Sequence, residues 1–196
     1  MTGAPLPLRH YRLSLAPALE AFRPELEYVC RFLETCHPLA RADEAETVLH
    51  YGGQAPAGAV QVPALLFPAG VRLDDDGIHP NFEALEGLEA QSNGVALLPP
   101  AERQGDAFFA RERPPQSLGY DALGLIFLLI SRLEARGSKA LKDDRYGRFP
   151  LEASLQYRRR EPNSPLADYA ARDVAAALLN DPTPPNLSEY KVWLTH

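Results

Sequence analysis

Apolar positions are most concentrated between residues 121 and 136, in the run ALGLIFLLI followed by SRLEAR. A segment that is apolar around nearly its whole circumference is typical of a helix covered on all sides. Asp121 suits the N-cap, because its carboxylate accepts hydrogen bonds from unpaired amides of the first turn. Gly137 can end the helix in a left-handed conformation. The pattern therefore predicts a buried central helix over residues 121–136.

Two further helices are expected on either side of the central one. Over residues 17–36 the apolar positions recur at spacings of three and four, which predicts a core-facing stripe. Pro24 is tolerated only near a helix start, so the regular part should begin around Phe22. A third helix is expected from Pro165, a residue favoured at the first helical position, to a stop at Asn180.

Short apolar runs bounded by Gly, Pro and Asp predict the strands. A hairpin-like turn is expected at 74–77, and Pro63 marks an edge or an irregularity in its strand. The predicted strands are 10–15, 47–51, 60–67, 71–73, 95–98 and 107–110, with a short helix at 81–92. Short strands among substantial helices indicate an α/β (or α+β) fold, a mixed sheet packed by the buried central helix and two flanking helices.

Composition and charge narrow the class of protein. The 196 residues are 45% hydrophobic and 23% charged, which suits an ordinary globular domain. A net charge of −6 argues against nucleic acid or an anionic membrane as the main partner. Cys30 and Cys36 lie six positions apart on a predicted helix, point in different directions and are poorly placed to pair. With no export signal at the N-terminus, these features predict a cytoplasmic protein.

The sequence shows no catalytic constellation and no cofactor motif. Cys36 and His37 are adjacent, but no second pair of ligands accompanies them, so they are a weak metal signal. The segment Asp74–Gly77 resembles part of a calcium loop, yet Arg72 occupies the first position, where an oxygen ligand is required. The glycines of Gly52–Gly58 lack the Gly-Lys-Ser/Thr ending that binds phosphate. We therefore expect no metal and no cofactor in this chain.

A loop rich in arginine is the candidate ligand site. Asp144, Arg145 and Arg148 lie beside aromatic residues, and arginine pairs bidentately with oxyanions, so the loop could hold an anionic or sugar ligand. Arg132 and Tyr157, from the same stretch, complete the candidate set. The favoured alternative is structural, with this loop fixed onto Glu134 or main-chain carbonyls next to the buried helix.

The same stretch carries a resemblance to a known family. Residues 131–134 (SRLE), 144–149 (DRYGRF) and 154–157 (SLQY) follow the apolar helix in a fixed order. This order resembles a bacterial domain of unassigned function that is typically found in front of a polysaccharide deacetylase domain of the chitooligosaccharide-deacetylase superfamily. The resemblance is carried by residues 118–157.

The C-terminal residues extend this resemblance. Residues 181–189 are proline-rich and predict a stiff linker. Residues 190–196 (YKVWLTH) are similar to the first strand of the deacetylase barrel, where Thr195 and His196 match. In those enzymes an Asp-x-Asp pair follows, with a catalytic base and a metal ligand. The resemblance thus implies an accessory domain at 1–180, a linker at 181–189 and a truncated barrel strand at 190–196.

The resemblance implies a non-catalytic N-terminal module of a deacetylase-like protein. Carbohydrate N-deacetylation would belong to a missing C-terminal domain that uses a divalent, zinc-like metal. This chain would position substrate or mediate assembly, with that domain in cis and possible carbohydrate as partners. The alternative is a free-standing binding or structural domain with no enzyme in cis.

Overall fold

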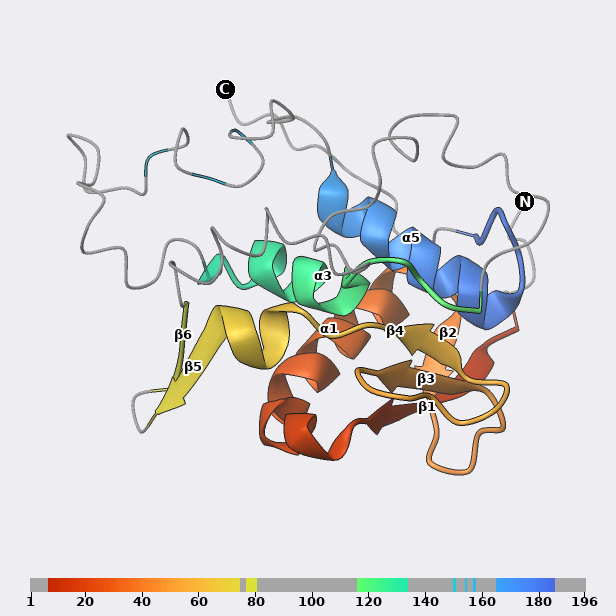
Figure 1. Cartoon of the computed structure of the whole chain (residues 1–196). Helices are drawn as coiled ribbons and strands as arrows, with labels where there is room; N and C mark the ends of the chain where they lie inside the picture. The colour runs from red at the N-terminus through yellow and green to blue at the C-terminus, as the bar shows by residue number, and fades with distance from the viewer. Residues whose placement is uncertain are drawn as a thin grey trace, which may run out of the picture.

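The computed structural model describes residues 7–74, 77–80, 116–133, 150, 154, 157 and 165–185. These residues form the predicted α/β fold, with a four-stranded sheet and a layer of helices (Figure 1). Several sequence-based expectations lie outside the described residues. They are the helix at 81–92, the strands at 95–98 and 107–110, the loop at 144–149 and the segment 186–196.

The four-stranded sheet is wholly parallel, in the order β2-β1-β3-β4. Its strands are β1 (Arg9–Leu15), β2 (Leu39–Arg41), β3 (Val48–Tyr51) and β4 (Val60–Val62). Ser117 forms a further parallel bridge with Gln61 at the β4 edge. The strand predicted at 60–67 is shorter than expected and ends at Val62, because Pro63 has no N–H to donate to a ladder.

In the part of the chain that the structure describes, antiparallel pairing is confined to a separate hairpin of β5 (Val71–Asp74) and β6 (Gly77–Pro80), in which Asp74 pairs with Gly77. This confirms the hairpin predicted around 74–77. The short helical turn η2 (Leu66–Gly70) leads into it from the sheet. Figure 1 shows the hairpin standing apart from the four-stranded sheet.

Three α-helices pack against one another and share one hydrophobic core with the sheet (Figure 1). They are α1 (Arg23–Cys36), α3 (Ala122–Ile130) and α5 (Leu166–Leu179), and the 3₁₀ helix η1 (Pro17–Phe22) precedes α1. Pro24 occupies the first turn of α1, as predicted. Helix α5 starts one residue later than expected, with Pro165 at the N-cap, and Asn180 ends it in a left-handed conformation (φ 53°).

Helix α3 is the predicted central helix, and its residues from Ala122 to Leu128 are all buried. Asp121 caps its first turn, as expected, by accepting a hydrogen bond from the Gly124 amide. The helix ends at Ile130 rather than at 136. The chain leaves the helical path because Arg132 adopts a left-handed φ of 53°.

Phe67 of η2 joins the sheet to the helices at the centre of the core. Its ring centroid lies 4.9 Å from that of Phe22 and 5.3 Å from that of Phe127, both in tilted arrangements. Tyr51 of β3 meets the same ring edge-on at 6.3 Å. Offset and edge-on pairs at these separations are favourable, so one aromatic side chain ties together η1, β3 and α3.

Candidate functional site

The crevice where open α/β sheets usually bind ligands is filled by this protein's own side chains. Such sites lie outside the carboxyl ends of the strands where the strand order reverses, which here is between β1 and β3. Gly52 follows β3 with a φ of +78°, and a Cβ built on it would lie 2.5 Å from Leu19 Cδ1 and 3.3 Å from Ala64 Cβ. The backbone and apolar side chains therefore close this end of the sheet.

Asp121 is buried at the same end of the sheet, where it is hydrogen-bonded to Tyr51 of β3. Its Oδ2 accepts hydrogen bonds from the Tyr51 hydroxyl (2.9 Å) and from the amides of Leu65 (2.8 Å) and Leu66 (2.7 Å). Its Oδ1 accepts from the Gly124 amide (2.8 Å). Burial raises the pKa of this carboxyl, while the four hydrogen bonds oppose that rise. With both oxygens engaged and no exposed surface, Asp121 is a structural carboxylate.

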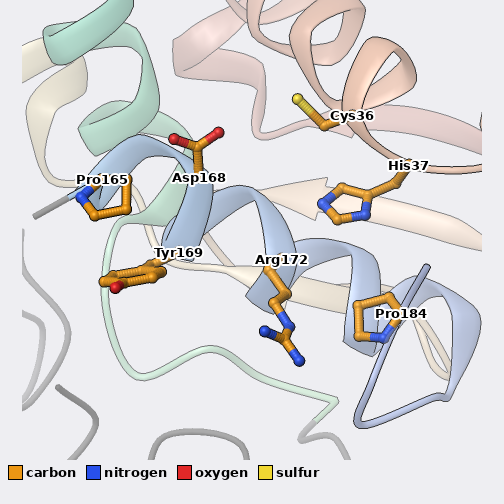
Figure 2. Close-up of a pocket in the computed structure, with 7 residues that line it drawn as sticks. All are labelled: Cys36, His37, Pro165, Asp168, Tyr169, Arg172 and Pro184. Carbon is orange, nitrogen blue, oxygen red and sulfur yellow. The ribbon is translucent and has the colours of Figure 1, made fainter. Parts of the chain in front are cut away.

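The main pocket of the described residues lies at the other end of the sheet, where α1 ends and β2 begins. Its volume is about 550 Å³, within the range of about 300–1,000 Å³ that is typical of small-molecule sites. Figure 2 shows its walls, which come from the end of α1, the start of α5 and the segment after α5. The lining residues are Cys36, His37, Pro165, Asp168, Tyr169, Arg172 and Pro184.

Helical spacing explains why α5 and its N-cap contribute four of these residues. Pro165, Asp168, Tyr169 and Arg172 follow one another at intervals of three, one and three, so they share one side of the helix. On the α1 side, His37 is the C-cap and has an extended backbone (φ −134°, ψ 158°), which carries its ring off the end of the helix. The two helix ends thus bring side chains from distant parts of the sequence together (Figure 2).

His37 is held in one tautomer by the chain that follows α5. Its side chain is buried, and its Nδ1 lies 2.8 Å from the carbonyl oxygen of Pro185. Because a carbonyl oxygen only accepts, Nδ1 carries the proton and Nε2 is left as an acceptor. Burial is the main cause that lowers the pKa of His37, with the charge of Arg172 acting in the same direction. Pro185 and Asp168 oppose this shift. The imidazole is therefore neutral at pH 7.

The α5 side of the pocket offers both signs of charge. Burial lowers the pKa of Arg172 and the nearby Asp173 opposes that shift, but an arginine remains protonated at any physiological pH. Asp168 supplies a carboxylate and Tyr169 a phenol to the same lining. The pocket can therefore donate hydrogen bonds from Arg172 and accept them at His37 and Asp168. Within the described ranges, no three His, Cys, Asp or Glu side chains are grouped to hold a metal ion.

Of the residues predicted from the sequence as a ligand site, the structure describes Arg132 and Tyr157, and neither is among the residues that line this pocket. Arg132 is exposed just after α3, and Tyr157 is 43% exposed, with its amide donating to Ser154 Oγ. Asp144, Arg145 and Arg148 lie outside the described residues, so the ligand role of this set stays a prediction. Sequence reasoning did single out Cys36 with His37, but only as a weak metal signal. The other signal in the sequence was the spacing of Asp168, Tyr169 and Arg172, which places them on one side of α5.

A family model matches residues 18–182, and its description is "Family of unknown function (DUF7033)". The chain belongs to this family. The DUF7033 match includes His37 and all four pocket residues of α5 and its N-cap, so most of the pocket lies within the family domain. The expected domain of unassigned function is thereby confirmed, whereas a deacetylase domain after it stays a prediction. No curated protein and no solved structure matches the chain.

None of the helices described for this DUF7033 member combines the length and the apolarity needed to cross a bilayer.

A second, more polar pocket of about 480 Å³ lies over the edge of the sheet between α1 and β2. Its lining includes an internal ion pair, in which Arg41 Nε lies 2.7 Å from Glu34 Oε1. The Tyr11 hydroxyl donates to the same oxygen at 3.1 Å. Glu34 is thus already used by the protein, and this pocket gives no comparable ligand site.

Cys30, which packs beside Tyr11, is expected to react slowly with thiol reagents. Cys30 and Cys36 are thiols that do not form a disulfide, as predicted, and both are buried; burial raises the pKa of Cys30 to about 11. Relative to an ordinary thiol, that shift lowers the thiolate fraction at pH 8 by about 100-fold. A Cys36→Ser variant isolates Cys30 for iodoacetamide labelling followed by mass spectrometry. Labelling as fast in the native state as in urea would contradict this expectation.

Proposed function

We propose that this chain is the non-catalytic front module of a polysaccharide deacetylase-like protein, and that it holds the following domain in place to position carbohydrate or mediate assembly. Two features support the proposal. The family match agrees with the expected accessory domain of unassigned function. Residues 190–196 resemble the first strand of the deacetylase barrel.

The observation that carries the proposal is that the chain is held in place where it leaves α5, at Pro184 and Pro185. The hydrogen bond from His37 to the Pro185 carbonyl joins residues 148 positions apart, at 2.8 Å. Pro184 lines the pocket beside Arg172 of α5 (Figure 2). The first residues of the predicted linker therefore lie against α1 and α5. A domain attached after residue 185 would therefore be tethered at a fixed point of this chain. Fewer of its orientations would be lost on docking, which lowers the entropic cost of docking.

The chemistry is assigned to the following domain. Hydrolysis of an N-acetyl group by a metal-activated water requires a cluster of ligands with an open position. The described residues hold no such cluster, and their most buried carboxylate, Asp121, is fully occupied by structural hydrogen bonds. As the resemblance implies, the divalent, zinc-like ion and the catalytic base would belong to the deacetylase-like domain.

Reading the gene beyond codon 196 tests the proposal directly. An Asp-x-Asp pair soon after His196, with a His-x-x-x-His pair further on, supports a deacetylase-like domain in cis. A stop codon at this point overturns the proposal and leaves the free-standing binding domain.

The purified chain alone is expected to release no acetate from acetylated sugars, with or without added divalent metal. A coupled acetate assay measures this, and the same chain extended through the downstream sequence is the positive control. Turnover by residues 1–196 that a chelator abolishes would contradict the non-catalytic assignment.

A free-standing binding domain is the second candidate. The observation that favours it is the pocket between α1 and α5, which has the size of a ligand site and polar side chains of both signs. This role requires nothing beyond residue 196.

A further inference from the structure

We propose that the pocket formed by His37, Asp168 and Arg172 binds a neutral, polyhydroxylated ring, of the size of one monosaccharide unit. This inference goes beyond the module role proposed above, because it stands on the pocket alone. It holds whether or not a deacetylase-like domain follows.

The shape of the pocket suits a ring with apolar faces. Its volume of about 550 Å³ accommodates a single small ring together with a few waters. Pro165, Pro184 and Tyr169 give it stiff, flat apolar surfaces, which lose little conformational entropy on binding. The C–H faces of a sugar ring are apolar and can pack against such surfaces.

The hydrogen-bonding groups of the pocket lining favour a ligand that carries hydroxyl groups. His37 Nε2 is a lone-pair acceptor on a ring that lines the pocket, and the hydrogen bond that holds this ring uses Nδ1 instead. An acceptor on a pocket wall can receive a hydrogen bond from a ligand donor. A hydroxyl can donate to His37 or Asp168 while it accepts from Arg172, so neighbouring hydroxyls on one ring can serve both walls.

The charges of the lining favour a neutral ligand. Asp168 and Arg172 contribute one negative and one positive charge, and His37 is neutral at pH 7. A phosphate or a polycarboxylate would be attracted by Arg172 but repelled by Asp168 at the same site. A polyamine would be attracted by Asp168 but repelled by Arg172. Among the lining residues that the structure describes, donors and acceptors are mixed and the two charges balance, which favours a polyol over an anion.

Saturation-transfer NMR and calorimetric titration of residues 1–196 test this assignment. The probes are glucose and N-acetylglucosamine, with cyclohexanol as a ring that lacks the neighbouring hydroxyls and inorganic phosphate as an anion. We expect saturable binding of at least one sugar, weaker binding of cyclohexanol and phosphate, and a shift of the His37 Nε2 resonance in ¹⁵N spectra.

His37→Asn is the decisive variant. Its amide N–H can still donate to the Pro185 carbonyl, so the anchor of the exit chain is kept while the Nε2 acceptor is lost. Sugar affinity should fall about tenfold, as expected for the loss of one hydrogen bond in a buried site. An unchanged urea midpoint would show that the fold is intact. If the variant fails to fold, the ¹⁵N shift of His37 in the wild-type chain decides instead.

Three results would overturn the assignment. They are no saturable sugar binding, cyclohexanol or phosphate binding as tightly as the sugars, and sugar binding that leaves His37 Nε2 unshifted and survives in a folded His37→Asn variant. None of these results bears on the sequence after residue 196, so the failure of the pocket and the failure of the proposed module role are distinguishable.

Discussion

Replacement of Asp121 by Asn is expected to destabilise the fold by about 3 kcal/mol, a large effect for a single substitution. The carboxylate accepts four hydrogen bonds in a site with no solvent exposure. An asparagine keeps only one acceptor oxygen, and its NH₂ group would point at a donor. At least one buried N–H would then lose its partner. Urea unfolding followed by circular dichroism measures the loss.

Tyr51→Phe is the matched control, because it removes only one of the four donors and leaves the carboxylate bonded to three amides. Its cost should be about 1 kcal/mol, the value of one ordinary hydrogen bond. Equal costs for the two variants would contradict the role of Asp121 as a shared acceptor.

The direction of the pKa shift of Asp121 predicts how its contribution to stability changes with pH. Burial raises the pKa of Asp121 in the folded state, so folding takes up a proton between the ordinary carboxyl pKa and the folded one. The contribution of this residue to stability therefore falls as the pH rises through that window, and it should be absent in Asp121→Asn. The difference between the two proteins, measured by urea unfolding at several acidic pH values, isolates this contribution.

Asp121 also shows how much of a residue's structural role can be predicted from the sequence alone. Its role as an N-cap was readable, because an acidic residue directly before an apolar run is a local signal. Its other donors, Tyr51, Leu65 and Leu66, lie 55 to 70 positions earlier in the chain. No local pattern reports such pairings, so a residue that looked like a simple cap proves to connect the sheet, η2 and α3.

The strands and helices show the same division between local and distant signals. Turn residues and prolines located β1, β3, α1 and the β5–β6 hairpin, because backbone chemistry acts over a few residues. The parallel pairing of β1 with β2 forms only after the chain has passed through α1, so no local pattern reports it. The pocket was missed for a similar reason. His37 and Arg172 become neighbours only when α5 packs against α1.

Gly52→Ala is expected to be as damaging as loss of the Asp121 carboxylate, at about 3 kcal/mol or more. Two costs combine at this position. Its φ of +78° is unfavourable for a residue with a Cβ, and the new methyl group would lie 2.5 Å from Leu19 Cδ1 in the closed end of the sheet. The core there is already packed, so Leu19 would have to leave its position.

Gly58→Ala separates these two costs. Gly58 has the same φ of +78°, but a Cβ there would meet nothing within 4 Å. Its cost should be that of the backbone conformation alone, about 1 kcal/mol. The excess cost of Gly52→Ala over Gly58→Ala, measured as the difference in unfolding free energy in urea, then reports the contact with Leu19. A Leu19→Ala substitution should recover part of that excess when it is combined with Gly52→Ala, because it removes the clashing atom. Equal costs at the two glycines would mean that the crevice between β1 and β3 has room for a methyl group.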